Sequence, residues 1–90
     1  TMKKEKFKLA SGKEVKLLEM SVDDIDFCND VPTVVQDKDG NSSIRNMSAA
    51  RTAWIRKGVD KCNDKFLKSL TEEDKNDLAV KIREFQDLGE

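Results

Sequence analysis

The chain has 90 residues, of which 39% are charged and 37% hydrophobic, and its formal net charge is -1. This length allows a single domain with a modest core, and the balanced charge gives no general attraction to nucleic acid or to an anionic membrane. The sequence contains no histidine, so the commonest general base and metal ligand of proteins is missing. These features predict a protein that is not an enzyme and that has no cofactor or metal.

The chain is predicted to form one α+β domain over residues 1–90, mainly α-helical, with an N-terminal β-hairpin followed by three or four helices. Its expected parts are the β-hairpin in residues 1–20, a short helix in 21–30, a mobile connection in 31–43 and a helical part in 44–90. No run approaches the roughly 18 apolar residues of a membrane span, and Thr1–Leu9 is too basic and too poor in apolar residues for a signal peptide. A cytosolic protein is therefore expected.

Polar and apolar residues alternate on both sides of the turn formers Ser11 and Gly12. Such alternation is typical of half-buried strands, so Lys6–Leu9 and Glu14–Leu17 are predicted to pair. Gly12 is expected to take a positive φ in the turn. One face of this hairpin then carries Phe7, Leu9, Val15 and Leu17, and a helix or a partner chain must cover it.

Ser21, followed by Asp23 and Asp24, is typical of a helix start, because a hydroxyl caps free N–H groups and carboxylates favour the first turn. This helix is expected over about Val22–Asn29. Pro32 ends it, since a proline and the residue before it are restricted to extended or turn geometry.

The next segment contains a candidate strand, Thr33–Gln36, and then a run of turn formers, Asp37–Ser43. The oxygen-bearing side chains of this run are faintly similar to a calcium loop. However, Lys38 interrupts the pattern, and Ser48 stands where an EF-hand has its bidentate glutamate. The run is therefore interpreted as a solvated connection without a metal.

A long helical region is predicted to begin at Ser43, taken as its N-cap. Apolar residues keep helical spacing through Ile44, Met47, Ala50, Trp54, Ile55, Gly58 and Val59, and Cys62, Phe66 and Leu70 extend the pattern. Two alternatives stay open: one long helix that is weakened at Gly58, or two helices that meet near 58–60.

The last helix carries its own start and stop signals. Thr71 is its expected cap, acidic residues fill the first turn, and Gly89 is suited to the left-handed conformation that ends a helix. The apolar stripe that recurs at steps of three and four residues, and that is expected to be buried, consists of Leu78, Ile82, Phe85 and Leu88.

The remaining reactive or charged side chains predict no site. Cys28 and Cys62 form no Cys-x-x-Cys pair, so two reduced thiols are expected. The basic residues of the helical region are Arg45, Arg51, Arg56, Lys57 and Lys61. They do not form one strip on a helix, and the negative charges of Asp60, Asp64 and the last helix oppose their positive field. No nucleic-acid partner is therefore expected.

Trp54, Ile55, Phe66 and Leu70 are the candidate partner-binding residues, because the helical region contains more large apolar groups than one core-facing stripe needs. The alternative is that these side chains are core anchors. Aromatic residues at helical spacing more often belong to a core than to an interface.

Three parts of the chain resemble the small tail-assembly proteins of long-tailed bacteriophages. The first is the strand, Ser-Gly-Lys turn and strand of Phe7–Leu17 with the capped acidic run Glu19–Asp24 after it, and the others are Trp54–Val59 and Ser69–Asp74. The resemblance implies a chaperone that binds the tape-measure protein or tail-tube subunits or, alternatively, a small structural subunit of the tail or baseplate. It carries over no catalytic motif and no binding residue.

The expected protein is thus a binding module that shields apolar surfaces of a phage tail protein in the host cytoplasm, with self-association as a further expected contact. The structural alternative would place it in the virion. A third class, a nucleic-acid-binding regulator, is disfavoured by the net charge of -1.

Overall fold

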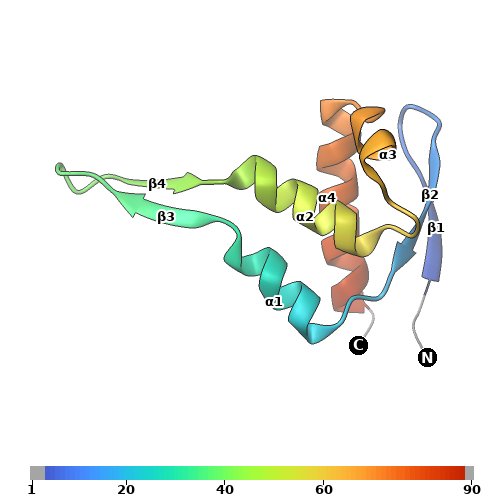
Figure 1. Ribbon diagram of the computed structural model, residues 1–90, viewed down its shortest axis with the longest axis horizontal. Helices are drawn as coiled ribbons and strands as arrows, with labels where there is room; N and C mark the ends of the chain where they lie inside the picture. Colours follow the sequence, from blue (N-terminus) through green and yellow to red (C-terminus); the bar gives the residue numbers. More distant parts are fainter. Residues whose placement is uncertain (1–3, 89–90) are drawn as a thin grey trace.

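Figure 1 shows the computed structural model of the chain, which describes residues 4–88. The predicted α+β class is confirmed, because the described residues form two antiparallel hairpins and four helices. In chain order the elements are β1 (Lys4–Lys8), β2 (Glu14–Leu18), α1 (Val22–Asp30), β3 (Thr33–Gln36), β4 (Ser42–Arg45), α2 (Met47–Gly58), α3 (Asp64–Lys68) and α4 (Glu72–Leu88). None of the described helices is both long enough and apolar enough to cross a bilayer.

The β1–β2 hairpin closes at the predicted turn. The Leu9 N–H donates to the Lys13 carbonyl at 2.7 Å, and Gly12 has a φ of +96°, which confirms the predicted positive φ. The predicted apolar face lies on the core: Leu9, Val15 and Leu17 are buried, and Phe7 is partly buried.

The helix α4 packs on α2 and on β2, and supplies the central stripe of the core. The predicted burial of Leu78, Ile82 and Phe85 is confirmed. The side chain of Leu88 and the whole of Gly89 lie outside the described residues.

Two of the three predicted hydroxyl caps, Ser21 and Thr71, are confirmed. The Asp24 N–H donates to Ser21 Oγ at 3.1 Å, and the Asp74 N–H donates to Thr71 Oγ1 at 3.0 Å. Each cap therefore satisfies one of the backbone donors that the first turn of a helix leaves free.

Residues 47–70 form two helices, which decides between the two alternatives. The chain leaves α2 after Gly58, and Val59 makes an isolated antiparallel bridge to Leu17 of β2. Lys61 then takes a φ of 57°, and the Asn63 side chain caps α3. The break is therefore held by pairing with the first hairpin.

The candidate strand Thr33–Gln36 is confirmed as β3. It pairs with β4, where the end of a connection and the start of a helix were expected, and residues 33–45 thus form a second hairpin, which we call the distal hairpin. Asp37 Oδ1 accepts the backbone N–H groups of Asp39 and Asn41, each at 2.9 Å, and so closes the turn. In Figure 1 the distal hairpin projects from the other elements. With the hairpin included, the structure measures 46 × 29 × 20 Å.

The predicted helical roles of Ser43 and Ile44 are wrong. Both residues lie in β4, where Ile44 is opposite Val34 of β3. The helix α2 begins only at Met47, after Asn46, which has a φ of 66° and makes no side-chain cap. Serine before an apolar spacing fits a helix start locally, but pairing with a strand earlier in the chain decides the conformation here.

Candidate protein-docking surface

The four residues predicted to bind a partner lie in or against the core. Trp54, Ile55 and Leu70 are buried, with Trp54 only 8% exposed, and Phe66 is partly buried against the same cluster. The interpretation of Trp54 as a core anchor is therefore confirmed. These four side chains do not form one exposed face, although Trp54 also lines a groove between α1, α2 and α4.

A different set of large apolar side chains is exposed. Six of them have between 55% and 72% of their surface exposed: Val22, Phe27, Val34, Ile44, Met47 and Val80. Most belong to α1, the distal hairpin and the beginning of α2. The sequence held one signal for this surface, since the apolar residues of α1 are spread over more than one side of a helix.

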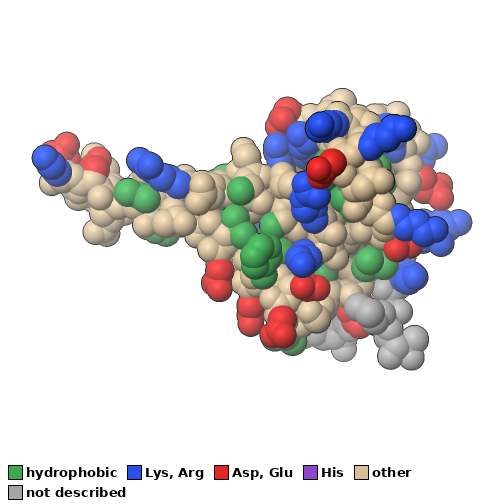
Figure 2. Space-filling view, viewed as in Figure 1, with side chains coloured by type: hydrophobic (Ala, Val, Ile, Leu, Met, Phe, Trp, Pro, Cys, Tyr) green, Lys and Arg blue, Asp and Glu red, His purple; other side chains and the backbone are tan. Residues whose placement is uncertain are grey.

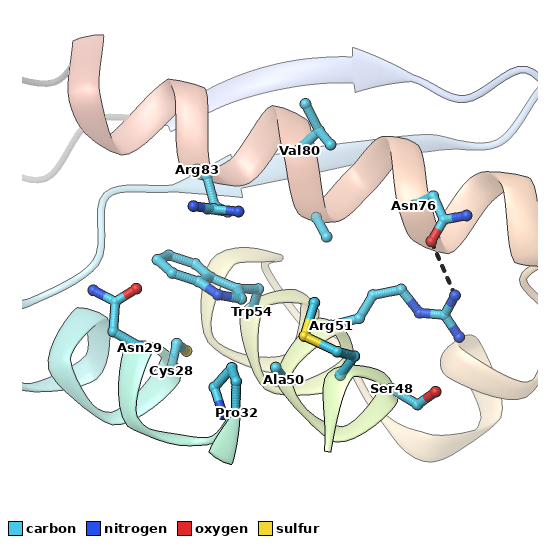
Figure 3. Close-up of a pocket in the computed structure, with 12 residues that line it drawn as sticks. Cys28, Asn29, Pro32, Ser48, Ala50, Arg51, Trp54, Asn76, Val80 and Arg83 are labelled. Atoms are coloured by element: carbon cyan, nitrogen blue, oxygen red, sulfur yellow. Dashed lines mark hydrogen bonds between the residues drawn. The ribbon is translucent and has the colours of Figure 1, made fainter. Parts of the chain in front are cut away.

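The first groove lies between α1, α2 and α4 and has a volume of about 410 Å³. Figure 3 shows the indole of Trp54 in this groove, with the guanidinium of Arg83 from α4 beside it. The Arg83 Cζ atom is 5.7 Å from the centre of the indole ring, a cation–π distance. The apolar lining consists mainly of Pro32, Met47, Ala50, Trp54, Ala79 and Val80.

The charge at the first groove is positive. Arg51 and Arg83 line it, whereas no described aspartate or glutamate does. Arg51 Nη1 donates to Glu72 Oε2 at 2.7 Å and to Asn76 Oδ1 at 3.0 Å, and this arginine lowers the pKa of Glu72. The Arg51 Nε atom is buried and has no hydrogen-bond partner among residues 4–88.

The second groove lies on the other side of α2, with a volume of about 490 Å³. At 3.6 residues per turn, Ala49, Thr52, Ala53 and Arg56 point away from the side that carries Ala50, Arg51 and Trp54. Figure 2 shows hydrophobic side chains gathered over α1 and α2 on the face turned to the viewer.

Phe27 and Lys57 form the edge of the second groove. Lys57 Nζ lies 5.6 Å from the centre of the Phe27 ring and 3.6 Å from Asp24 Oδ1. The lysine therefore holds the ring by a cation–π contact, yet the ring remains 56% exposed.

The distal hairpin adds open strand edges to this surface. Its strands β3 and β4 pair with each other and with no other strand in the described part of the chain. Outer strand edges present unpaired N–H and C=O groups, and the cross-strand pair of Val34 and Ile44 adds exposed apolar surface.

The surface contains no reactive centre among the residues that the structure describes. No group of three or more Cys, Asp or Glu side chains there is placed to hold a metal ion. Cys28 at the first groove is buried, and burial, aided by the charge of Asp24, raises the pKa of its thiol, so the unreactive protonated form is favoured. Both cysteines are free thiols, as predicted.

No protein-family model, no curated protein and no solved structure matches this chain. The functional argument therefore starts from the geometry of the surface. Two apolar grooves with basic edges, together with open strand edges, are suited to binding a polypeptide.

Proposed function

We propose that this chain is a non-enzymatic protein-binding module that acts as a phage tail-assembly chaperone. In this role it covers apolar surface on a tape-measure or tail-tube protein before that protein assembles. The observation that carries the binding function is the layer of α1 and α2, which has an apolar groove on each side and continues into a projecting hairpin.

This construction is unfavourable for an isolated chain. Large exposed apolar side chains that gather on one region are typical of an interaction site rather than of an ordinary surface. A lone two-stranded hairpin is also marginally stable in water, and the contacts of β3 and β4 are almost wholly with each other. A partner that covers this region would stabilise it.

The first groove is the site that we assign to the tail protein. An amphipathic helix of the partner can place its apolar side chains against Trp54 and Val80. Carboxylates at the edge of such a helix can pair with Arg83. The charge of the groove thus favours a partner segment that is apolar and acidic.

The tail-assembly role is supported by the resemblance of Phe7–Leu17, Trp54–Val59 and Ser69–Asp74 to small tail-assembly proteins. The first of these segments forms the β1–β2 hairpin, and the second covers the part of α2 that packs on α4. Both segments contribute to the core, and Trp54 of the second segment also lines the first groove.

The test is co-expression with the tape-measure and tail-tube proteins encoded by the same phage genome, followed by measurement of the affinity of the complex. Val80→Asp places a charge at the edge of the first groove, so we expect it to weaken binding by about tenfold or more. The matched control is Val22→Asp, an equally polar change at an exposed residue that lines neither groove.

Two results would contradict the proposal: no complex with either tail protein, or a complex that Val80→Asp leaves unchanged. Retention of the protein in purified virions would instead favour the structural-subunit alternative. A salt-dependent shift of DNA in place of a protein complex would favour the nucleic-acid-binding class.

A further inference from the structure

The surface around the second groove combines a projecting aromatic ring with a flat helix surface that such a ring can cover. Phe27 stands out from α1, while the side of α2 beside it carries small residues, of which Ala49 is exposed, Thr52 is partly exposed and Ala53 is buried. An aromatic ring can therefore lie on the flat helix surface that these residues leave. One patch thus contains a projecting group and a surface that fits such a group.

The two helices of this patch carry opposite charges. The sequence of α1 contains four aspartates and no basic residue, whereas α2 contains Arg51, Arg56 and Lys57 and no acidic residue. Asp23, Phe27 and Asp30 share one side of α1, because they are four and three residues apart. The aromatic ring is therefore flanked by carboxylates, and the opposite wall of the groove is basic.

We propose that a second copy of this chain occupies the second groove and forms a two-fold symmetric dimer. The α1 helix of each copy lies across the α2 helix of the other. Phe27 then packs on the partner subunit's Ala49 and Thr52, and the carboxylates of Asp23 and Asp30 approach the partner subunit's Arg56. A symmetric dimer requires each patch to complement itself, and this patch combines both halves of the contact.

The ion pairs within one chain leave the acidic charges of the proposed contact unpaired. Lys57 pairs with Asp24, and Arg56 pairs with Asp64. By contrast, Asp23 and Asp30 take part in no ion pair between residues 4 and 88. A dimer that places the acidic α1 on the basic α2 would therefore give Asp23 and Asp30 a cationic partner, with the Arg56 guanidinium shared between Asp64 of its own chain and the carboxylates of the other copy.

The first groove is not suited to the same contact. It is lined by Arg51 and Arg83 and, among the described residues, by no carboxylate, so two copies of it would place like charges together. The dimer and the complex with a tail protein therefore use opposite sides of α2. This inference goes beyond the proposed function and does not depend on it.

The test is sedimentation equilibrium of the purified chain between about 1 μM and about 1 mM. We expect a mass of twice 10.2 kDa at the upper end of this range. Phe27→Asp should weaken association by about 30-fold or more, because it places a carboxylate where an aromatic ring is buried. Val22→Asp, the same type of change on another side of α1, should leave the dimer intact.

Charge reversal tests the arrangement of the helices. Asp23→Lys combined with Asp30→Lys should weaken the dimer and reduce its salt dependence, and the further change Arg56→Glu should restore association. Far-ultraviolet circular dichroism checks that each variant keeps its helices. A monomer at every concentration, equal association of Phe27→Asp and the unmodified chain, or no effect of charge reversal would overturn the proposal.

The two binding sites are separable in the same variants. Val80→Asp should lose the tail protein and still dimerise, while Phe27→Asp should become monomeric with an intact first groove. If the chain dimerises but binds neither tail protein, this inference stands and the proposed function is rejected.

Discussion

At the residue scale, Gly58 determines how closely α2 and α4 approach. A Cβ atom at this position would clash with the Ile82 Cγ2 atom and would lie 3.1 Å from both Cγ1 and Cδ1 of the same side chain. Ile82 is fully buried, so it has little room to move away. The sequence pattern marks Gly58 only as a weak helical position. In the structure, the absence of a side chain at Gly58 leaves the space that Ile82 of α4 occupies against α2.

We therefore expect Gly58→Ala to destabilise the fold by about 1–3 kcal/mol, as overpacking does in a filled core. At an ordinary helical site the same change stabilises by about 0.5–1 kcal/mol. Urea denaturation measures the difference in the free energy of unfolding. The control is Ser48→Ala on an exposed part of α2, which should stay within about 0.5 kcal/mol; a stabilised Gly58→Ala variant would contradict the close contact.

Asp74 is the second residue with a role that the pattern of the sequence understates. It is only 1% exposed, and its carboxylate faces the Thr71 N–H and the Ser11 side chain of the first hairpin turn. The Ser11 side chain, and then the hydrogen bonds with Thr71, lower the pKa of Asp74 against the opposing effect of burial. This carboxylate thus caps the start of α4 through Thr71, while its Oδ1 atom has no hydrogen-bond partner among residues 4–88.

A carboxylate whose pKa is lowered by folding stabilises the protein above its unfolded pKa of about 3.9, and that contribution is lost as the pH falls through the lower folded pKa. We expect Asp74→Asn to be less stable than the unmodified chain at pH 7, with a difference that narrows below about pH 4. Denaturant titrations across this pH range measure the effect. Asp77→Asn, at an exposed position of α4, should show no such narrowing.

At the element scale, the sequence predicted those elements whose signals are local. The first hairpin, α1 and α4 each carry a turn or a hydroxyl cap within their own residues, and all three formed as expected. The distal hairpin was missed because β4 consists of Ser42–Arg45, a polar run whose strand conformation depends on pairing with β3. The division between α2 and α3 likewise depends on a bridge to β2.

The first hairpin gives a prediction at this scale. Gly12 has a φ of +96°, and a Cβ there would meet no atom of residues 4–88 within 4 Å, so any penalty comes from the backbone alone. We expect Gly12→Val to destabilise the fold by about 1–2 kcal/mol, measured by thermal or urea denaturation. Gly12→Asn is the control, because asparagine tolerates positive φ far better; equal stability of the valine variant would count against the turn.

At the scale of the whole molecule, the exposed surface was not predictable from helical spacing. The pattern identified Trp54, Ile55 and Leu70 as large apolar residues, but the crossing of α2 over α4 decides which of them are covered. Val80 shows the reverse case, since it lies outside the stripe of α4 and remains at the edge of the first groove. Periodicity predicts which residues share a face, whereas tertiary packing decides which faces stay open.

The shape of the molecule leads to a gradient of stability. The distal hairpin contacts little besides itself, whereas α2 and α4 pack on each other through fully buried side chains. The hairpin should therefore open locally more often than the core helices do. In amide hydrogen exchange, we expect residues 33–45 to exchange at least about 100-fold faster than the amides of Ile55 and Ile82. Binding of a tail protein over the hairpin would slow this exchange; equal protection of the hairpin and the two core helices in the free monomer would show that the hairpin is held by contacts with the body of the protein.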